Sequence, residues 1–216
     1  NDDDSSATTD PVFGLKPLNQ KDFVMFYNLV DFCQDLLSEQ SIELFEKWVH
    51  RFLYDIISAS TKYPLVSGFY RFASLVMNIC LKLRYFNSNS NGDTTIESME
   101  TDTNETSNNN IIGVTILIQK FAHEVLSRLK QYRDDLLTSC LQFILSLPSE
   151  CIDYDFTDYV PAVQMALDMG LSYLPLAEQV IDSLERWSKS SSLTLTSYYE
   201  QLLPYFDDFL RLSHHQ

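Results

Sequence analysis

The chain has 216 residues, of which 45% are hydrophobic and 13% aromatic, so it is long enough to bury a substantial apolar core. Its formal net charge is −15, and because a phosphate backbone repels so acidic a chain, a general nucleic-acid-binding surface is not expected. Only five glycines and seven prolines are present, a scarcity that favours long helices over many turn-linked strands.

The four cysteines and the chain ends indicate an intracellular piece of a longer polypeptide. Cys33, Cys80, Cys140 and Cys151 are widely spaced and form no C-x-x-C pair, so we interpret them as reduced thiols. No leader sequence opens the chain, and no apolar run approaches the roughly 18 residues of a membrane span. The chain starts without methionine and stops soon after an apolar helical pattern, so we expect it to continue in a larger protein.

Helical periodicity begins after a polar lead-in. Residues 1–19 are acidic, aperiodic and rich in serine and threonine, so a flexible segment is predicted there. Apolar residues then recur three or four positions apart over 23–37, over 41–56 and over 66–83, which predicts three amphipathic helices. Residues 20–86 are therefore predicted to be helical repeats.

Residues 87–112 interrupt this pattern. The segment is polar, net acidic and low in complexity, with no apolar period, so we predict a disordered insertion. Ser90 and Thr94 each have an acidic residue three positions further on, a pattern that acidophilic kinases phosphorylate, and they are the candidate phosphorylation sites.

Helical periodicity resumes over residues 113–216. The expected helices are 114–129, 136–147, 158–169, 175–187 and 196–212. Gly170 follows the third of these and is expected to adopt the left-handed conformation at the C′ position. Ser172, rather than Leu174, is expected to cap the helix after it.

These elements predict an all-α fold of about eight helices. The helices pair antiparallel through short breaks, and each pair can bury its apolar face only by stacking on its neighbours. An α-solenoid of HEAT-like or armadillo-like helix pairs is therefore the predicted architecture. No strict sequence repeat is found, so a closed helical bundle is the alternative.

No catalytic constellation, cofactor-binding motif or metal-ligand cluster is found in the sequence. His123-Glu124 resembles the start of a zinc-protease motif, but Ser127 occupies the position of the second histidine. His50 stands alone on an aromatic-rich helix, where a packed histidine is the simpler interpretation. The segment is therefore predicted to be non-enzymatic, with no cofactor and no small-molecule substrate. A small all-α enzyme would need convergent titratable residues.

Basic residues near two helix ends are the one positive signal for a contact site: Lys82, Arg84, Arg128, Lys130 and Arg133. Cations favour the C-terminal end of a helix, where the dipole is negative, and this is their ordinary role. The alternative is a patch that contacts phosphate or an acidic partner. If the helices predicted over 66–83 and 114–129 are antiparallel neighbours, their C-terminal ends lie at opposite edges, and the basic residues cannot form a single patch.

Five blocks of the sequence, in order, closely resemble the N-terminal helical-repeat region of the catalytic subunits of DNA-dependent protein kinases, and the resemblance covers most of residues 21–210. The blocks are KDFVMFYNLVDFC (21–33), YPLVSGFYRF (63–72), LKLRYF (81–86), LKQYRDDLLTSCLQFILSLP (129–148) and YVPAVQMALDMGLSYLPLAEQVIDSLERWS (159–188).

This resemblance implies a very large nuclear serine/threonine kinase related to the phosphatidylinositol-3-kinases. Such a parent is recruited by the Ku heterodimer to DNA double-strand breaks and acts in non-homologous end joining. Its kinase domain, with ATP and Mg²⁺, would lie outside these residues, so no catalytic residue is carried over. The segment would belong to a cradle of HEAT repeats that contacts neighbouring repeats and, through the parent, Ku and double-stranded DNA ends, with no membrane contact.

The third predicted helix departs from the family pattern. The family's helix is more basic, whereas only Arg71, Lys82 and Arg84 are cationic across residues 68–86, so direct DNA contact by this helix is not expected. A free-standing α-solenoid adaptor for protein–protein interaction is the alternative function.

Overall fold

The computed structural model describes residues 19–33, 66–82, 103–152, 155–189 and 195–213, which contain helices and no strand. The α-helices in these ranges are α1 (Gln20–Cys33), α3 (Ser67–Lys82), α4 (Thr103–Arg128), α5 (Asp134–Leu145), α6 (Val160–Gly170), α7 (Leu174–Ser188) and α8 (Thr196–Ser213). Short 3₁₀ helices η4 (Leu129–Gln131), η5 (Ser149–Cys151) and η6 (Phe156–Asp158) lie in the connections. The predicted all-α fold is confirmed for the described part of the chain, and the helix expected over 41–56 falls outside it.

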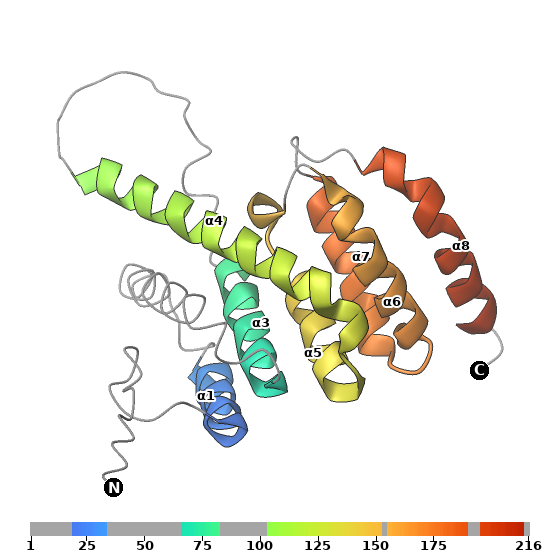
Figure 1. Ribbon diagram of the computed structural model, residues 1–216, viewed down its shortest axis with the longest axis horizontal. Helices are drawn as coiled ribbons and strands as arrows, with labels where there is room; N and C mark the ends of the chain where they lie inside the picture. Colours follow the sequence, from blue (N-terminus) through green and yellow to red (C-terminus); the bar gives the residue numbers. More distant parts are fainter. Residues whose placement is uncertain (1–18, 34–65, 83–102, 153–154, 190–194, 214–216) are drawn as a thin grey trace, which may run out of the picture.

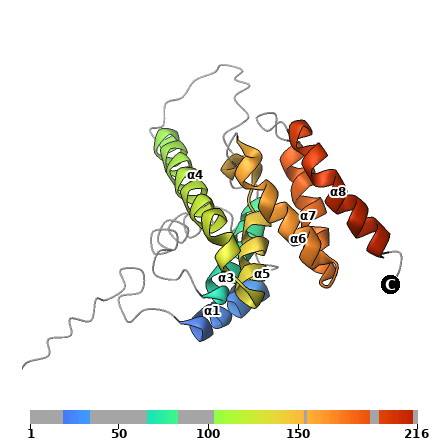
Figure 2. The ribbon, with the colours of Figure 1, turned by 45° about the vertical axis from the view of Figure 1, so that its right-hand side comes forward.

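The helices stack neighbour on neighbour (Figure 1). In one layer α1 packs on α3, α3 on α5 and α5 on α7, while α6 packs on both α7 and α8 on the other side. Helix α4 crosses α3 and α5 obliquely. Among the described helices, α1 and α8 lie at opposite ends in both views (Figures 1 and 2). This open arrangement is that of an α-solenoid and not of a closed bundle, in which the first and last helices would meet.

Helices α3 and α5 run parallel, as equivalent helices of successive pairs do. The guanidinium group of Arg71 contacts the Asp135 carboxylate, and its Nε donates to Ser139 Oγ at 3.3 Å. One turn further along α3, Ser74 Oγ donates to the carbonyl of Gln142 at 3.3 Å. Residue numbers increase together on both helices, so their N-terminal ends lie at the same edge of the layer.

An aromatic cluster joins α3, α4 and α5. The ring of Phe121 from α4 lies 5.8 Å from Phe69 and 5.9 Å from Tyr70, both of α3, and 5.1 Å from Phe143 of α5. All four side chains are buried. Such pairs contribute about 0.5–1.5 kcal/mol each beyond the burial of their area, so this cluster fixes α4 across the first layer.

A second aromatic cluster packs α7 against the connection between α5 and α6. Trp187 is fully buried, with its ring centroid 5.6 Å from that of Phe156 and 6.3 Å from that of Tyr159. Its Nε1 donates to the carbonyl of Leu147 at 2.9 Å, and Arg186 Nε donates to the same carbonyl at 3.2 Å. Arg186 Nη2 also donates to the carbonyl of Leu145, the last residue of α5. Carbonyls at a helix end lack partners within the helix, so α7 supplies a donor that the end of α5 needs and links one helix pair to the next.

Two expectations about the turn from α6 to α7 are wrong. Gly170 is the last residue of α6 and does not adopt a left-handed φ. It is needed because a Cβ at this position would lie 2.7 Å from the Cβ of Ala177, so the glycine permits the close approach of α7. Tyr173, and not Ser172, is the N-cap residue of α7, and it makes no side-chain capping bond. Pro175 in the first turn removes one of the N–H groups that would need a partner.

The predicted boundary of the insertion also differs from the structure, because α4 begins at Thr103 and residues 103–112 belong to it. Residues 103–110 are polar, so they offer no apolar stripe that periodicity could reveal. Extending an existing helix adds one hydrogen bond for each residue fixed, so the packed second half of α4 can support this polar extension. Residues 87–102 lie outside the described ranges.

Candidate interaction surfaces

The five basic residues predicted as a possible contact patch do not come together. Arg84 lies outside the described residues, and Lys82 is the last residue of α3. Arg71 contacts Asp135 at the start of α5, and α3 continues for roughly 16 Å from Arg71 to Lys82. Lys82 therefore lies at the opposite edge of the layer from the start of α5, where the other three residues are found.

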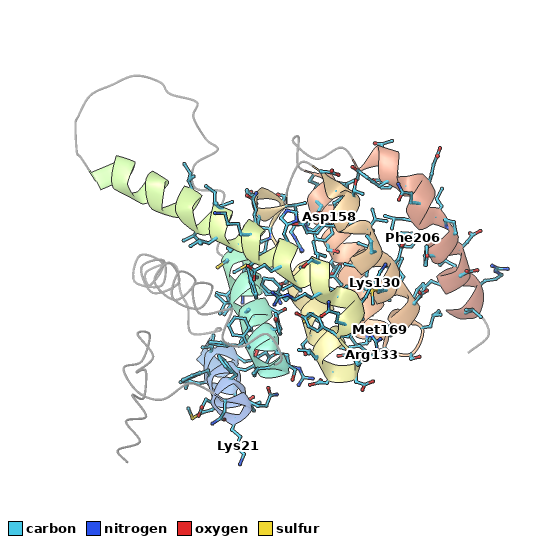
Figure 3. The ribbon with its side chains drawn as sticks, in the orientation of Figure 1. Lys21, Lys130, Arg133, Asp158, Met169 and Phe206 are labelled. Carbon is cyan, nitrogen blue, oxygen red and sulfur yellow. The ribbon has the colours of Figure 1, made fainter. Side chains whose placement is uncertain are left out.

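Arg128, Lys130 and Arg133 share the corner between α4 and α5, where Figure 3 labels the last two. Arg133 Nη1 donates to the carbonyls of Lys130 and Tyr132, each at 2.7 Å. The next residue, Asp134, has a φ of 48°, so the chain turns sharply here. Arg133 thus holds the backbone of this corner, while Arg128 and Lys130 are exposed. The candidate phosphorylation sites Ser90 and Thr94 fall outside the described residues.

The cysteine thiols of the core are free and unreactive. Cys80, Cys140 and Cys151 are all buried and form no disulfide, in agreement with the prediction of reduced thiols for these three. Burial raises the pKa of each thiol well above its ordinary value, so the thiolate, which is the nucleophilic form, is suppressed.

A histidine and a carboxylate form a pair between α4 and η6. His123 Nδ1 lies 3.4 Å from the Asp158 carboxylate and so links α4 to η6. Across the described ranges, no three His, Cys, Asp or Glu side chains are grouped as metal ligands would be. No helix among the described residues combines the length and apolar character that crossing a membrane requires.

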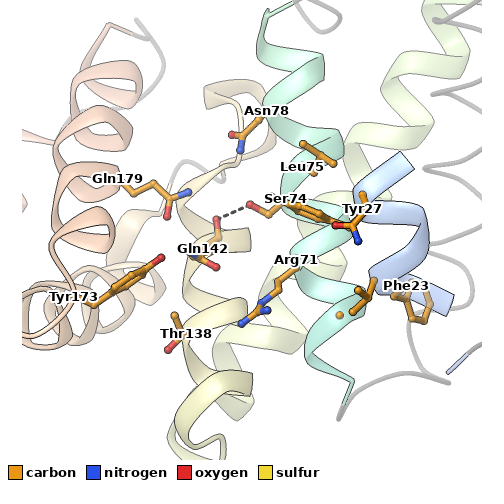
Figure 4. A pocket seen from close by; sticks show the side chains of 13 residues that line it. Phe23, Tyr27, Arg71, Ser74, Leu75, Asn78, Thr138, Gln142, Tyr173 and Gln179 are labelled. Atoms are coloured by element: carbon orange, nitrogen blue, oxygen red, sulfur yellow. Dashed lines mark hydrogen bonds between the residues drawn. The ribbon is translucent and has the colours of Figure 1, made fainter. Parts of the chain in front are cut away.

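A groove of about 700 Å³ crosses the exposed face of the first layer (Figure 4). We call it the polar groove. Its lining includes Phe23 and Tyr27 of α1, Arg71, Ser74, Leu75 and Asn78 of α3, Thr138 and Gln142 of α5, Tyr173 before α7, and Gln179 of α7. On α3 the lining residues recur three or four positions apart, so they share one helix face opposite the buried aromatic residues. Sequence reasoning missed this groove because polar residues at that spacing look like an ordinary solvent-facing stripe.

The electrostatics of the polar groove are nearly balanced. Burial and the nearby Asp31 carboxylate raise the pKa of Tyr27, against the opposing effect of the Arg71 guanidinium. Arg71 is the one charged residue among the described lining residues, and its charge is matched by Asp135. Gln179 Oε1 is buried and has no hydrogen-bond partner, so one acceptor on the wall of the groove is unsatisfied.

Comparison with known proteins points to a single family. A family model described as "DNA-PKcs, N-terminal" matches residues 2–216. The chain is 42% identical over 207 residues to the DNA-dependent protein kinase catalytic subunit of Canis lupus familiaris, which covers 95% of the chain and 5% of that relative. The protein of the same name from Mus musculus is 40% identical with the same coverage. That of Dictyostelium discoideum is 33% identical over 234 residues, which cover 92% of the chain and 5% of that relative. The chain thus spans about 5% of the length of these relatives.

Proposed function

The chain belongs to the family of N-terminal regions of DNA-dependent protein kinase catalytic subunits, and from this premise we propose that it is a non-catalytic scaffold segment of such a kinase. The observation that carries the proposal is the family match over nearly the whole chain. The stacked helices are consistent with it, because a solenoid derives its shape from contacts between neighbouring pairs. The adaptor and small-enzyme alternatives have no comparable support.

The parent's activity is part of the same proposal. We infer that it is a serine/threonine kinase that uses ATP and Mg²⁺ in a domain outside this chain. The names of the relatives support a DNA-dependent protein kinase, and the residue specificity and cofactors are proposed from the sequence resemblance. Recruitment by the Ku heterodimer to double-stranded DNA ends, a role in non-homologous end joining and nuclear localisation are proposed from the sequence resemblance. The acidic charge of the chain and the dispersal of its basic residues favour DNA contact through other parts of the parent.

Neighbouring repeats of the parent are the proposed direct partners. One face of α8 packs on α6, yet Tyr199, Leu203 and Leu212 of α8 are 43%, 60% and 50% exposed. A further helix pair stacked on α8 would bury these side chains in the way that α8 itself covers α6. The mechanical role would be to hold a fixed curvature between the repeats on either side.

The experiment is to weaken the α5–α7 junction inside a full-length kinase of this family. Trp187→Ala removes the central side chain of that junction, and Ile181→Ala, at an exposed position of α7, is the matched control. We expect Trp187→Ala to lower phosphorylation stimulated by Ku and DNA ends while leaving the basal rate and the KM for ATP unchanged. If limited proteolysis shows that the segment has loosened while stimulated activity stays at the level of the control, the scaffold role is wrong.

A further inference from the structure

We propose that the exposed side of α8 binds an amphipathic helix of the parent chain that follows residue 216 and carries lysine or arginine along one flank. Because the parent supplies this helix, the proposal rests on the proposed function. It adds the chemistry and the register of the partner helix, which follow from the apolar spacing on α8 and from two carboxylates beside it.

An apolar stripe runs along α8. Tyr199, Leu203 and Leu210 are 43%, 60% and 56% exposed, and Phe206, labelled in Figure 3, packs partly against the core. Positions 199, 203, 206 and 210 follow one another at intervals of four, three and four residues, so they lie along one side of the helix. A second helix packs on an apolar side with this spacing, so the stripe extends the core of the molecule toward a further helix.

The stacking order of the described helices favours a later part of the same chain as the partner. Helix α3 packs on α5, α5 on α7 and α6 on α8, so each helix contacts the one that comes second after it. The same step beyond α8, which lies at one end of the stack, places a following helix on the stripe (Figure 1). The chain spans about 5% of its relatives, so a parent of that length has further residues to supply this helix. A second copy of the chain is disfavoured, because each copy carries a net charge of −15.

Two available carboxylates border the stripe on one side. Glu200 and Asp207 are exposed, and neither forms an ion pair with another residue of the described ranges. Asp207 comes four residues after Leu203 and three before Leu210, so it lies next to the stripe. Glu200 precedes Asp207 by two helical turns, which places the two carboxylates on the same side, roughly 10 Å apart along the axis. Lysine or arginine side chains two turns apart on the partner helix would pair with both, whereas acidic side chains there would be repelled.

Photo-crosslinking in the full-length parent kinase identifies what covers the stripe. The probe is p-benzoylphenylalanine in place of Leu203, and the control carries it in place of Ile112, which is 56% exposed on α4. We expect the probe at position 203 to crosslink within its own chain to one helix beyond residue 216, with lysine or arginine beside its apolar side, and the control probe not to reach that helix. Crosslinking to a second copy, to another polypeptide, to a helix without these cations or to no polypeptide would overturn the proposal.

Charge reversal in the full-length kinase tests the flank. Glu200→Lys combined with Asp207→Lys should make the backbone amides of α8 exchange with deuterium roughly 3- to 10-fold faster, because two ion pairs become two repulsions. Glu124→Lys combined with Asp168→Lys makes the same change of net charge at exposed positions of α4 and α6 and should leave exchange in α8 unchanged. Equal exchange in the two double variants would overturn the cationic flank.

The crosslink reports contact without kinase activity, so its result is independent of the test of the scaffold role. If the probe at position 203 reaches the expected helix while Trp187→Ala leaves stimulated phosphorylation at the level of its control, the scaffold role is wrong and the contact of α8 stands. If Trp187→Ala lowers stimulated phosphorylation while the probe reaches no such helix, the scaffold role stands and the assignment of the partner helix is wrong.

Discussion

Replacement of Trp187 tests whether the α5–α7 junction holds successive helix pairs together. The side chain is fully buried, packs edge-on against Phe156 and Tyr159, and donates to the Leu147 carbonyl. Truncation of a buried tryptophan to alanine costs about 3–5 kcal/mol of unfolding free energy, from lost burial and from the cavity left behind. The Leu147 carbonyl keeps Arg186 Nε as a donor, so no penalty for an unsatisfied acceptor is added.

Trp187→Phe separates packing from hydrogen bonding. Phenylalanine retains most of the apolar contact and loses the indole N–H, so we expect a loss of about 1–2 kcal/mol. Ile181→Ala, at a position of α7 that is 52% exposed, should change stability by less than about 0.5 kcal/mol. Urea unfolding followed by circular dichroism measures the change in unfolding free energy for each of the three variants, with the same m value applied to all of them. A loss below about 1 kcal/mol for Trp187→Ala, or equal losses for the alanine and phenylalanine variants, would refute the packing argument.

Three further predictions concern helix contacts and buried thiols. Gly170→Ala should lower the unfolding free energy by about 1–3 kcal/mol, because the added Cβ would lie 2.7 Å from the Cβ of Ala177. Gly113→Ala should instead stabilise α4 by about 0.5–1 kcal/mol, because a Cβ added at Gly113 has no neighbouring atom within 4 Å. Thermal unfolding of the two variants should therefore shift in opposite directions, and a shared direction would contradict the structure. Gln20→Ala removes the side-chain acceptor of the Gly68 N–H at 2.8 Å and should cost about 1–2 kcal/mol in urea unfolding; an unchanged midpoint would mean that this bond does not hold α1 on α3. Burial raises the pKa of each thiol above its ordinary 9.0, so above about pH 9 the unfolded chain loses thiol protons that the folded chain retains, and the unfolding free energy should fall as pH rises. An unfolding free energy that stays constant above about pH 9 would show that the thiols titrate as readily in the folded chain as in the unfolded one.

The pattern of neighbouring residues in the sequence was sufficient to predict helices such as α5 and α7 and to predict the family. The apolar spacing over 136–147 and 175–187 predicts α5 and α7 to within two residues at each end, because helical periodicity is a property of neighbouring positions. Pro175 marks the first turn of α7 for the same local reason. The ordered blocks of sequence likewise predicted the family that the comparisons identify.

Tertiary structure alone decided how these helices meet. The reason that position 170 is glycine lies seven residues away at Ala177, and the indole of Trp187 finds its acceptor 40 residues away at Leu147. The polar groove exists because parallel helices bring Asn78 and Gln142 to one face, although these residues are far apart in sequence. Periodicity shows which face of a helix is polar, but it does not show which other polar face will lie beside it. That pairing depends on long-range contacts between helices, and those contacts determine both the scaffold junction and the polar groove.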